Sequence, residues 1–350
     1  MISKKILLVS FEMTYSGSPV ATLKMARVLR KMGYQVDIWT LNEGPFAIEF
    51  SRDGFEVKNI NFPADAGQEL EDLLSEYKLC ICHTIFCSEI ACYIQRIVNT
   101  VLYIHEAGNI SDLIDDCDIN LDDFLNIKRY WCVSEYAKEK ILEKYSLNKL
   151  DILPNYVDRY LVDRKPRSDT KLRLCIAGTV EYRKGLDVVV KALDLLPEEK
   201  QECVELHVIG RIPVWAESYA SDNLNHKCIQ YHGEIQDVST LFDLYASMDL
   251  FIVASRDESC SLVALEAAML KKPLLVTENT GAKYVLDNPK MILKTEDERE
   301  LANGIMNFME NRSLISYEGN KNYKRYKRKA SLRNYKKQLK HNIYKIKFSL

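Results

Sequence analysis

Long hydrophobic runs are missing from this 350-residue sequence. The apolar run ILLVSF near the N-terminus is short and ends at Glu12, so we expect neither a signal peptide nor a membrane span. Net charge is also small, because 48 Lys and Arg face 50 Asp and Glu. This balance gives no sign of a nucleic-acid partner. A hydrophobic content of 47% is enough for two packed cores, so the chain is predicted to be globular.

The ten cysteines lack the regular spacing of a disulfide framework or of a zinc site. They lie mostly inside apolar runs such as LCIC at 79–82 and LCIAG at 174–178, and the pair at 80 and 82 has the wrong interval for a zinc ribbon. We therefore interpret them as buried free thiols in a reducing cytoplasm, with disulfides as the alternative.

Short β-rich runs alternate with amphipathic stretches along the whole chain, a pattern that predicts parallel sheets covered by helices. After the first strand, Ser18-Pro19 starts a helix that ends at Gly33. A second helix is predicted at 186–196. The expected strands are 5–11, 34–39, 55–60, 78–84, 100–106, 129–134, 150–155, 171–178, 204–210, 228–233, 249–255 and 273–279.

The stretch DRYLVDRKPRSDT at 158–170 is polar and resembles an interdomain linker. We therefore predict an N-terminal Rossmann-like domain over 1–162, a C-terminal Rossmann-like domain over 170–325, and a basic C-terminal helix over 326–350 that returns to the first domain. Two such α/β domains are expected to enclose a cleft.

Ligands of open parallel sheets bind beyond the carboxyl ends of the strands, so the residues after each strand are the candidates. Gly17 lies in YSGSP, before a helix N-terminus whose backbone N–H groups suit a phosphate or a sugar. The alternative is a turn that only joins the strand to the helix, as most such turns do. His105 lies at the end of the predicted strand at 100–106, where a satisfied structural histidine is the commoner case. Arg183 and Lys184 lie in GTVEYRKG, which suits a diphosphate, and a solvated surface turn is the alternative.

The stretch RDESCSLVALEAAM, at 256–269, contains two glutamates, Glu258 and Glu266. Apolar residues surround the predicted helix axis, so this helix is expected to be buried. A carboxylate on a buried helix is costly unless it has polar partners, so Glu266 should pair with a basic side chain or with ligand hydroxyls.

These residues resemble the retaining glycosyltransferases of family 4, which have the GT-B fold. The strongest element is the E-x7-E signature formed by Glu258 and Glu266. RKG at 183–185, SGS at 16–18, His105, VSEYAKEKIL at 133–142 and LPNYVD at 153–158 support it. The chain departs from the family pattern at Thr179, at Ser259 and Ser261, and at Tyr156, so the resemblance does not identify the sugar.

The resemblance implies a role for each candidate residue. Glu266 is expected to bind the ribose of the donor nucleotide, and Glu258 and His105 are expected to contact the donor sugar. Arg183 and Lys184 should neutralise the diphosphate in place of a metal ion or other cofactor. The remaining donor-binding residues that the resemblance implies are Gly17, Gly178, Cys260, Ser261 and Leu262.

Two other functions remain open at this point. Paired carboxylates also serve glycoside hydrolases, although the basic residues near Glu266 suit phosphate better. A catalytically silent GT-B subunit that partners an active transferase is the non-enzymatic alternative. Asp116 and Asp118 form a DxD-like pair within the acidic run at 112–123, and we interpret it as a solvated loop or helix face because it lies outside the predicted nucleotide-binding half.

The segment 321–347 contains twelve Lys or Arg and no acid. We interpret this segment either as a helix with a solvated basic face or as a surface that is attracted to anionic lipid headgroups. The two interpretations are compatible. The resemblance implies a nucleotide-sugar donor, a glycan or lipid-linked acceptor, and a setting in cell-surface polysaccharide or glycolipid assembly. The expected location is the cytoplasm, with possible peripheral attachment to the inner face of the plasma membrane.

Overall fold

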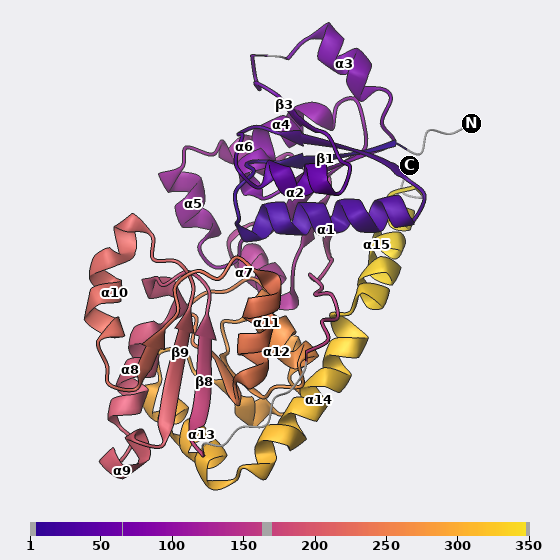
Figure 1. Cartoon of the computed structure of the whole chain (residues 1–350). Coiled ribbons are helices and arrows are strands. Elements are labelled where there is room, and N and C mark those ends of the chain that lie inside the picture. The colour runs from indigo at the N-terminus through magenta and orange to yellow at the C-terminus, as the bar shows by residue number, and fades with distance from the viewer. Residues whose placement is uncertain (1–4, 65, 163–169, 348–350) are drawn as a thin grey trace. The chain divides into compact units, whose positions relative to one another are not determined.

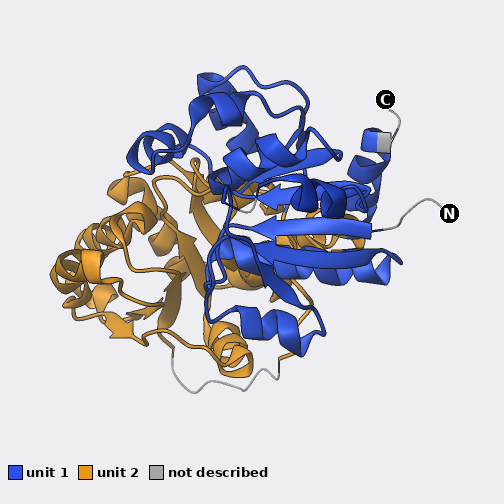
Figure 2. Ribbon diagram, turned by 90° about the horizontal axis from the view of Figure 1, so that it is seen from above, with its two compact units in different colours: residues 1–154, 336–350 blue, residues 155–335 orange. Residues whose placement is uncertain are grey.

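The computed structural model describes residues 5–64, 66–162 and 170–347. The chain divides into two compact units (Figure 2). Unit 1 comprises residues 1–154 and 336–350, and unit 2 comprises residues 155–335. Each unit is built on one parallel sheet, as the alternating pattern of the sequence predicts.

Unit 1 contains a seven-stranded parallel sheet with the order β3-β2-β1-β4-β5-β6-β7. The strand order reverses direction between β1 and β4, which is the position where open α/β sheets bind ligands. Strands β4 and β5 are buried along their whole length, as expected for central strands covered on both faces. The strands are β1 (Lys5–Ser10), β2 (Gln35–Thr40), β3 (Val57–Asn59), β4 (Leu79–His83), β5 (Thr100–Ile104), β6 (Tyr130–Cys132) and β7 (Leu150–Ile152).

The helices of unit 1 connect these strands (Figure 1). They are α1 (Gly17–Lys31), α2 (Ala47–Arg52), α3 (Gln68–Leu74), α4 (Ser88–Ile94), α5 (Ile110–Asp116), α6 (Leu121–Leu125) and α7 (Glu135–Lys144), with the 3-10 turn η1 (Ile85–Cys87). Helix α1 begins just before the predicted Ser18-Pro19 start, and Gly33 follows its C-cap with a φ of 86°. Glycine adopts this left-handed conformation without strain, which explains where the helix ends.

Unit 2 contains a six-stranded parallel sheet with the order β10-β9-β8-β11-β12-β13. Its order reverses between β8 and β11. The strands are β8 (Leu172–Ala177), β9 (Val204–Ile209), β10 (Ile229–Tyr231), β11 (Leu250–Val253), β12 (Leu274–Thr277) and β13 (Ile292–Leu293). The sequence pattern predicted all of these strands except β13, which has two residues and is too short to show a period.

The helices of unit 2 include the long C-terminal pair α14 and α15 (Figure 1). They are α8 (Leu186–Asp194), α9 (Glu198–Gln201), α10 (Glu217–Leu224), α11 (Val238–Ser247), α12 (Leu262–Met269), α13 (Glu298–Glu310) and α14 (Ser313–Lys329). Helix α15 (Leu332–Lys347) starts in unit 2 and continues into unit 1. The 3-10 turns are η2 (Tyr182–Lys184), η3 (Val214–Ala216), η4 (Gly281–Val285) and η5 (Pro289–Met291).

The unit boundaries differ from the expected domains at 162, 170 and 325. Residues 155–162 belong with unit 2 because Val157 bonds through its N–H to Ala330 and through its carbonyl to the Tyr326 hydroxyl, while Tyr160 stacks on Phe242. Part of the expected linker, 163–169, lies outside the described residues, as do 1–4 and 348–350.

The single basic helix expected over 326–350 is instead two helices. Helix α14 ends before Ala330, whose carbonyl accepts the Val157 N–H, and α15 begins after Ser331. The return of the C-terminal helix to the first unit is confirmed. Asn342 donates to the Ile152 carbonyl at 3.2 Å, and Lys345 pairs with Asp151 at 2.6 Å.

All ten cysteines lie within the described ranges and are free thiols, and eight of them are buried. Cys117 and Cys203 are the exposed ones. The prediction of free thiols is therefore confirmed. Among the helices of the described residues, none has the length and apolar character that crossing a membrane requires.

Candidate active site

The turn after β8 brings two cations to the carboxyl end of the unit 2 sheet. Gly178 ends the strand with a φ of 127°, and a Cβ there would lie 3.6 Å from Cε of Lys184, so this side chain lies against the glycine. Gly185 has a φ of 72°, and a Cβ at this position would lie 2.2 Å from the Ala254 carbonyl oxygen. Only glycine fits there, and this close approach holds η2 against the end of β11.

Glu258 lies in the loop after β11 and pairs with both cations of η2. Its Oε2 accepts a hydrogen bond from Nζ of Lys184 and lies 3.6 Å from Nη1 of Arg183. Burial alone would raise the pKa of this carboxyl group, but the charges of Lys184 and Arg183 and the hydrogen bond from Lys184 outweigh burial and lower it. Glu258 is therefore ionised at neutral pH. The predicted set of Arg183, Lys184, Gly178 and Glu258 comes together in one place.

Arg256 fixes the geometry of this cluster, and the sequence patterns did not single it out. Its guanidinium binds Asp187 through two hydrogen bonds of 3.0 and 2.8 Å. It also donates to the Tyr182 carbonyl at 2.5 Å and to Glu296 at 2.8 Å, and it stacks 3.6 Å from the Tyr182 ring. The backbone N–H of Arg256 donates to the Arg183 carbonyl at 2.8 Å. Arg256 thus ties η2, α8 and the loop after β11 together.

A second backbone support comes from the loop after β12. Glu258 donates its N–H to the Asn279 carbonyl at 3.0 Å, and its carbonyl accepts the Gly281 N–H at 2.7 Å. The Asn279 amide donates to the Arg256 carbonyl at 3.0 Å. Glu258 is therefore held in place by its backbone as well as by its side chain.

Helix α12 starts at Leu262, in the segment that follows Glu258. Ser261 is its N-cap, and the Ser261 hydroxyl accepts the Ala264 N–H at 3.3 Å. The other N–H groups of the first turn are the donors that a helix leaves for a ligand, and they carry the positive end of its dipole. Cys260 is buried, and burial raises the pKa of its thiol to about 12, so it is a neutral packing residue rather than a nucleophile.

The expectation that α12 is buried all round was wrong. Ala264, Leu265, Ala267, Ala268 and Met269 are buried, whereas Leu262, Val263 and Glu266 are partly exposed. Positions 262, 263 and 266 share one helix face because they are three and four residues apart. Glu266 therefore lies on the partly exposed face of α12. Its charge raises the pKa values of Tyr245 and Cys175, which places the carboxylate near β8 and α11, although burial is the larger cause of both shifts.

Gly17 is the first residue of α1 in unit 1, next to the reversal of strand order at β1. The N-cap Ser16 makes no side-chain capping bond, because its hydroxyl and that of Thr14 both donate to Glu12, at 3.1 and 2.7 Å. The Ser18 hydroxyl is buried and has no hydrogen-bond partner among the described residues. No heavy atom lies within 4 Å of a Cβ built on Gly17, so the N-terminus of α1 is open at this point.

His105 follows β5 at the same edge of the unit 1 sheet. Its Nε2 lies 3.1 Å from Nδ1 of His83, which ends β4, and the two rings stack at 5.2 Å. Burial lowers the pKa of His105 to about 3, so its ring is neutral. Glu106 holds the adjacent backbone by accepting N–H groups from His105 at 3.0 Å and Ile85 at 3.3 Å. The sequence reasoning missed His83, although it ends a predicted strand as His105 does.

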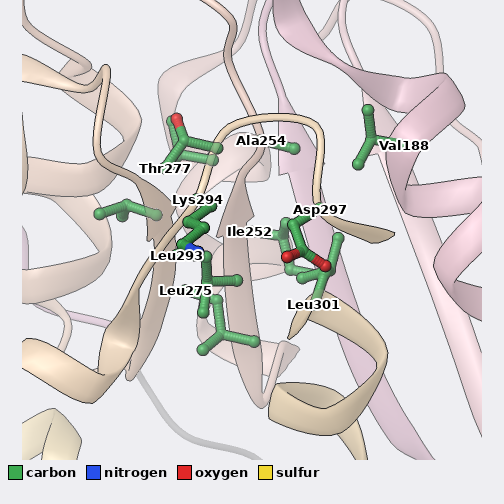
Figure 3. A pocket seen from close by; sticks show the side chains of 11 residues that line it. Val188, Ile252, Ala254, Leu275, Thr277, Leu293, Lys294, Asp297 and Leu301 are labelled. Carbon is green, nitrogen blue, oxygen red and sulfur yellow. The ribbon is translucent and has the colours of Figure 1, made fainter. Parts of the chain in front are cut away.

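Two other features do not form part of this cluster. A cavity of about 10 Å³ lies among β11, β12, α8 and α13, lined by aliphatic side chains such as Val188, Ile252 and Leu301 (Figure 3). It has room for roughly one water molecule. Asp116 and Asp118 are exposed at the end of α5, as predicted for a solvated segment, and no group of metal-ligating residues occurs in the described part of the chain.

Comparison with known proteins finds a family model that matches the part of the chain with this site. Residues 160–330, which contain the whole cluster, match the family model described as glycosyl transferases group 1. This part of the chain is thus similar to the glycosyl transferases group 1. The segment includes β8 to β13 and therefore the entire sheet that carries Arg183, Lys184, Glu258 and Glu266.

Two relatives are similar over shorter segments. An uncharacterized glycosyltransferase of Methanocaldococcus jannaschii is 26% identical over 186 residues, which are 49% of this chain and 46% of that protein. A D-inositol 3-phosphate glycosyltransferase of Xylanimonas cellulosilytica is 33% identical over 126 residues, which are 34% of this chain and 29% of that protein. The matched segments thus span less than half the length of either relative.

The fold comparison extends over nearly the whole chain. The crystal structure of Anabaena HepE in complex with UDP has a TM-score of 0.83 and 15% identity, and it covers 97% of this chain and 100% of that chain. Sucrose-phosphate synthase from Thermosynechococcus elongatus has a TM-score of 0.78 and 16% identity, with 98% of each chain covered. The predicted α/β fold of GT-B type, built from two Rossmann-like domains, is therefore confirmed.

Proposed function

We propose that this protein is a retaining glycosyltransferase that moves a sugar from a nucleotide diphosphate to an acceptor hydroxyl. The observation that carries the proposal is the cluster of Lys184, Arg183 and Glu258 at the reversal of strand order in the unit 2 sheet. This is where an open α/β sheet binds its ligand. The cluster also lies in the segment that matches the family model of the glycosyl transferases group 1.

The chemistry of the cluster fits a diphosphate leaving group. Lys184 and Arg183 supply two positive charges, and their side chains are 21% and 39% exposed, so a ligand can reach both. Negative charge grows on the β-phosphate as the bond to the anomeric carbon breaks, and fixed cations stabilise that charge without reorganisation. The N-terminus of α12 adds backbone donors beside them. We propose that these groups act without a metal ion.

Glu258 and Glu266 hold the donor in this proposal. Glu266 lies on the partly exposed face of α12, where a carboxylate accepts hydrogen bonds from both hydroxyls of a ribose. Glu258 is ionised and lies next to the cations, so it faces the hydroxyls of the donor sugar once a diphosphate engages Lys184. Glu258 lacks the raised pKa of a general acid, because the charges of Lys184 and Arg183 lower its pKa.

The first unit supplies His105 and the Gly17 turn in this proposal, as contacts to the donor sugar and to phosphate or acceptor. The setting that the family suggests is assembly of a cell-surface polysaccharide or a glycolipid. HepE of Anabaena is described in complexes with UDP, and with UDP-glucose, so uridine diphosphate sugars are the first donors to test.

The exposed cations at the end of α14 support a lipid-linked acceptor. Lys327, Arg328 and Lys329 are all exposed, and the neighbouring basic helix α15 adds Lys336, Lys337 and Lys340 on its exposed side. We propose that these residues attract an anionic membrane surface, where each exposed cation contributes about 1 kcal/mol.

The test measures binding and turnover separately. Purified protein is titrated with UDP, GDP and ADP by calorimetry, and is then incubated with the matching sugar nucleotides while nucleoside diphosphate release is followed. We expect one nucleotide to bind and its sugar donor to be slowly hydrolysed, with the released sugar keeping its anomeric configuration in NMR spectra. Absence of binding to every nucleotide contradicts the proposal. Binding without turnover across the donor panel favours a catalytically silent subunit.

A further inference from the structure

A pair of stacked histidines lies at the carboxyl edge of the unit 1 sheet, and its hydrogen bonding determines what His105 offers to a ligand. His83 ends β4 and His105 follows β5, so the two rings project from neighbouring strands. Nδ1 of His83 lies 3.1 Å from Nε2 of His105, with the ring planes 15° apart. Because this contact uses Nε2 of His105, Nδ1 is the ring nitrogen of His105 that remains for a substrate.

The direction of this hydrogen bond follows from the other nitrogen of His83. The His83 side chain is completely buried, and its Nε2 has no hydrogen-bond partner in the described part of the chain. Each neutral imidazole carries one proton. A proton on Nε2 of His83 would leave a buried N–H donor without an acceptor, which native proteins rarely tolerate. The proton therefore belongs on Nδ1, from which it is donated to Nε2 of His105.

This arrangement leaves His105 with its own proton on Nδ1. Burial lowers the pKa of both rings, and His105 also lowers that of His83, so neither ring carries a second proton at neutral pH. Tyr103 packs against both rings, at 5.2 Å from His83 and 4.4 Å from His105, and limits their rotation. A hydrogen bond to one ring nitrogen is a general means of fixing the tautomer at the other.

We propose that His83 is a positioning residue that holds His105 in the Nδ1–H tautomer, so that His105 presents a neutral N–H donor to an oxygen of the sugar substrate. The ligand part of this statement rests on the proposed glycosyl transfer. The tautomer part concerns the ligand-free protein and stands independently of it. His83 itself does not touch substrate, because it is completely buried.

The first experiment is ¹⁵N NMR of the ligand-free protein with labelled histidine. The six histidines give a small set of ring signals, and His105 is assigned from the signal lost in His105→Gln. We expect a protonated Nδ1 and an unprotonated Nε2 at neutral pH. Protonation of Nε2 instead overturns the proposal, whether or not the protein turns over any sugar nucleotide.

Variants of His83 then test the cause. His83→Phe keeps an aromatic ring but removes the donor, so His105 should shift toward the Nε2–H tautomer. His83→Asn places an amide N–H near the position of Nδ1 and has no group at the position of Nε2, so it should retain the wild-type tautomer. An unchanged His105 spectrum in folded His83→Phe overturns the proposal.

Unit 2 offers a matched control. His207 and His232 form a second stacked pair, with Nδ1 of His207 lying 2.9 Å from Nε2 of His232 and the rings 5.1 Å apart. His207→Phe should leave the His105 signals unchanged. In turnover assays we expect His83→Phe to lower kcat at least about tenfold with little change in nucleotide affinity, and His83→Asn to recover most of the loss. Equal kcat in His83→Phe and wild type overturns the ligand part.

Discussion

Nζ of Lys184 donates a hydrogen bond to Oε2 of Glu258, 74 residues further along the chain. The two residues follow β8 and β11, which are paired neighbours in the unit 2 sheet. In the ligand-free protein this ion pair joins the two groups that the proposed reaction needs. A diphosphate must therefore compete with Glu258 for Lys184, and the released carboxylate becomes available to the donor sugar.

Replacement of Lys184 by Ala should depress turnover by at least about 100-fold, because one preorganised donor to a developing charge is lost. The same change should raise the pKa of Glu258, since Lys184 is the larger of the two charges that lower it. The measurement is kcat with the preferred donor, with circular dichroism to verify folding. Lys290→Ala, an exposed lysine of the same unit, is the control. Wild-type turnover in Lys184→Ala would falsify the diphosphate role.

Replacement of Glu266 by Gln should weaken nucleotide binding by about 10- to 100-fold, because hydrogen bonds to a charged acceptor are stronger than those to an amide. Calorimetry with the nucleoside diphosphate measures the effect without any need for turnover. Glu199→Gln removes an exposed carboxylate on α9 and should change nothing. A dissociation constant equal to that of the wild type would rule out a ribose contact.

Replacement of Arg256 by Lys keeps the positive charge, but lysine cannot make the bidentate hydrogen bonds with Asp187. The change should therefore weaken the attachment of η2. We expect a loss of about 2 kcal/mol in stability, which lowers Tm by about 5 °C, together with weaker nucleotide binding. Thermal unfolding with and without nucleotide gives both quantities. Arg299→Lys, on the exposed side of α13, serves as the control. An unaltered Tm and affinity would show that Arg256 does not organise the cluster.

The histidine pair should make the protein sensitive to mild acid. His83 and His105 have lowered pKa values in the folded state, His105 to about 3, so the unfolded chain binds protons more readily than the native one. The contribution of the two histidines to the free energy of unfolding is fully present above the ordinary histidine pKa of about 6.5. It declines as pH falls below that value, by about 1.4 kcal/mol per pH unit for each histidine.

His83→Phe should remove the contribution of one histidine from this pH dependence. The measurement is the free energy of unfolding in urea between pH 6.5 and 5.5. Glu106 acts in the opposite direction, because burial raises its pKa, but it is unchanged in the variant and cancels in the comparison. A slope identical to that of the wild type would show that His83 titrates normally in the folded protein.

Replacement of Lys327, Arg328 and Lys329 by Gln should abolish co-sedimentation with anionic vesicles at low salt. The attraction is electrostatic and should also weaken as salt rises, because exposed charges are screened. Vesicles of neutral lipid provide the control surface. Equal binding of the wild type to both kinds of vesicle would refute the electrostatic form of the proposal.

The sequence predicted much of the unit 2 site because a parallel sheet orders its loops. Arg183, Lys184 and Glu258 follow strands that the hydrophobic pattern identified, and the carboxyl ends of paired strands lie at one edge. Twelve of the thirteen strands within the described residues were predicted in the same way. The pattern therefore located the loops, and residue chemistry selected the charged positions within them.

Other features depend on side-chain packing, which periodicity does not report. The contact between Arg256 and Asp187 joins a loop to a helix 69 residues away, and no local pattern marks it. The partly exposed face that carries Glu266 is set by what packs on α12, not by the composition of the helix. His83 ends a strand, so the rule that ligands bind beyond the carboxyl ends of strands could have selected it as it selected His105. Its proposed role, however, depends on the lack of a hydrogen-bond partner for its Nε2 among the described residues.

Helix α15 completes unit 1 with a segment that is far from its strands in the sequence. Ile343 and Ile346 lie beside Ile6 and Leu79 at the start of β1 and β4, so the last helix covers part of the first core. Unit 2 is thus an insertion between two segments of unit 1. The segment that stops at Pro154 lacks residues 336–350 of unit 1. Because contacts between segments far apart in the chain carry a larger entropic cost of loop closure, we expect the docking of α15 on β1 and β4 to be a late step in the folding of unit 1.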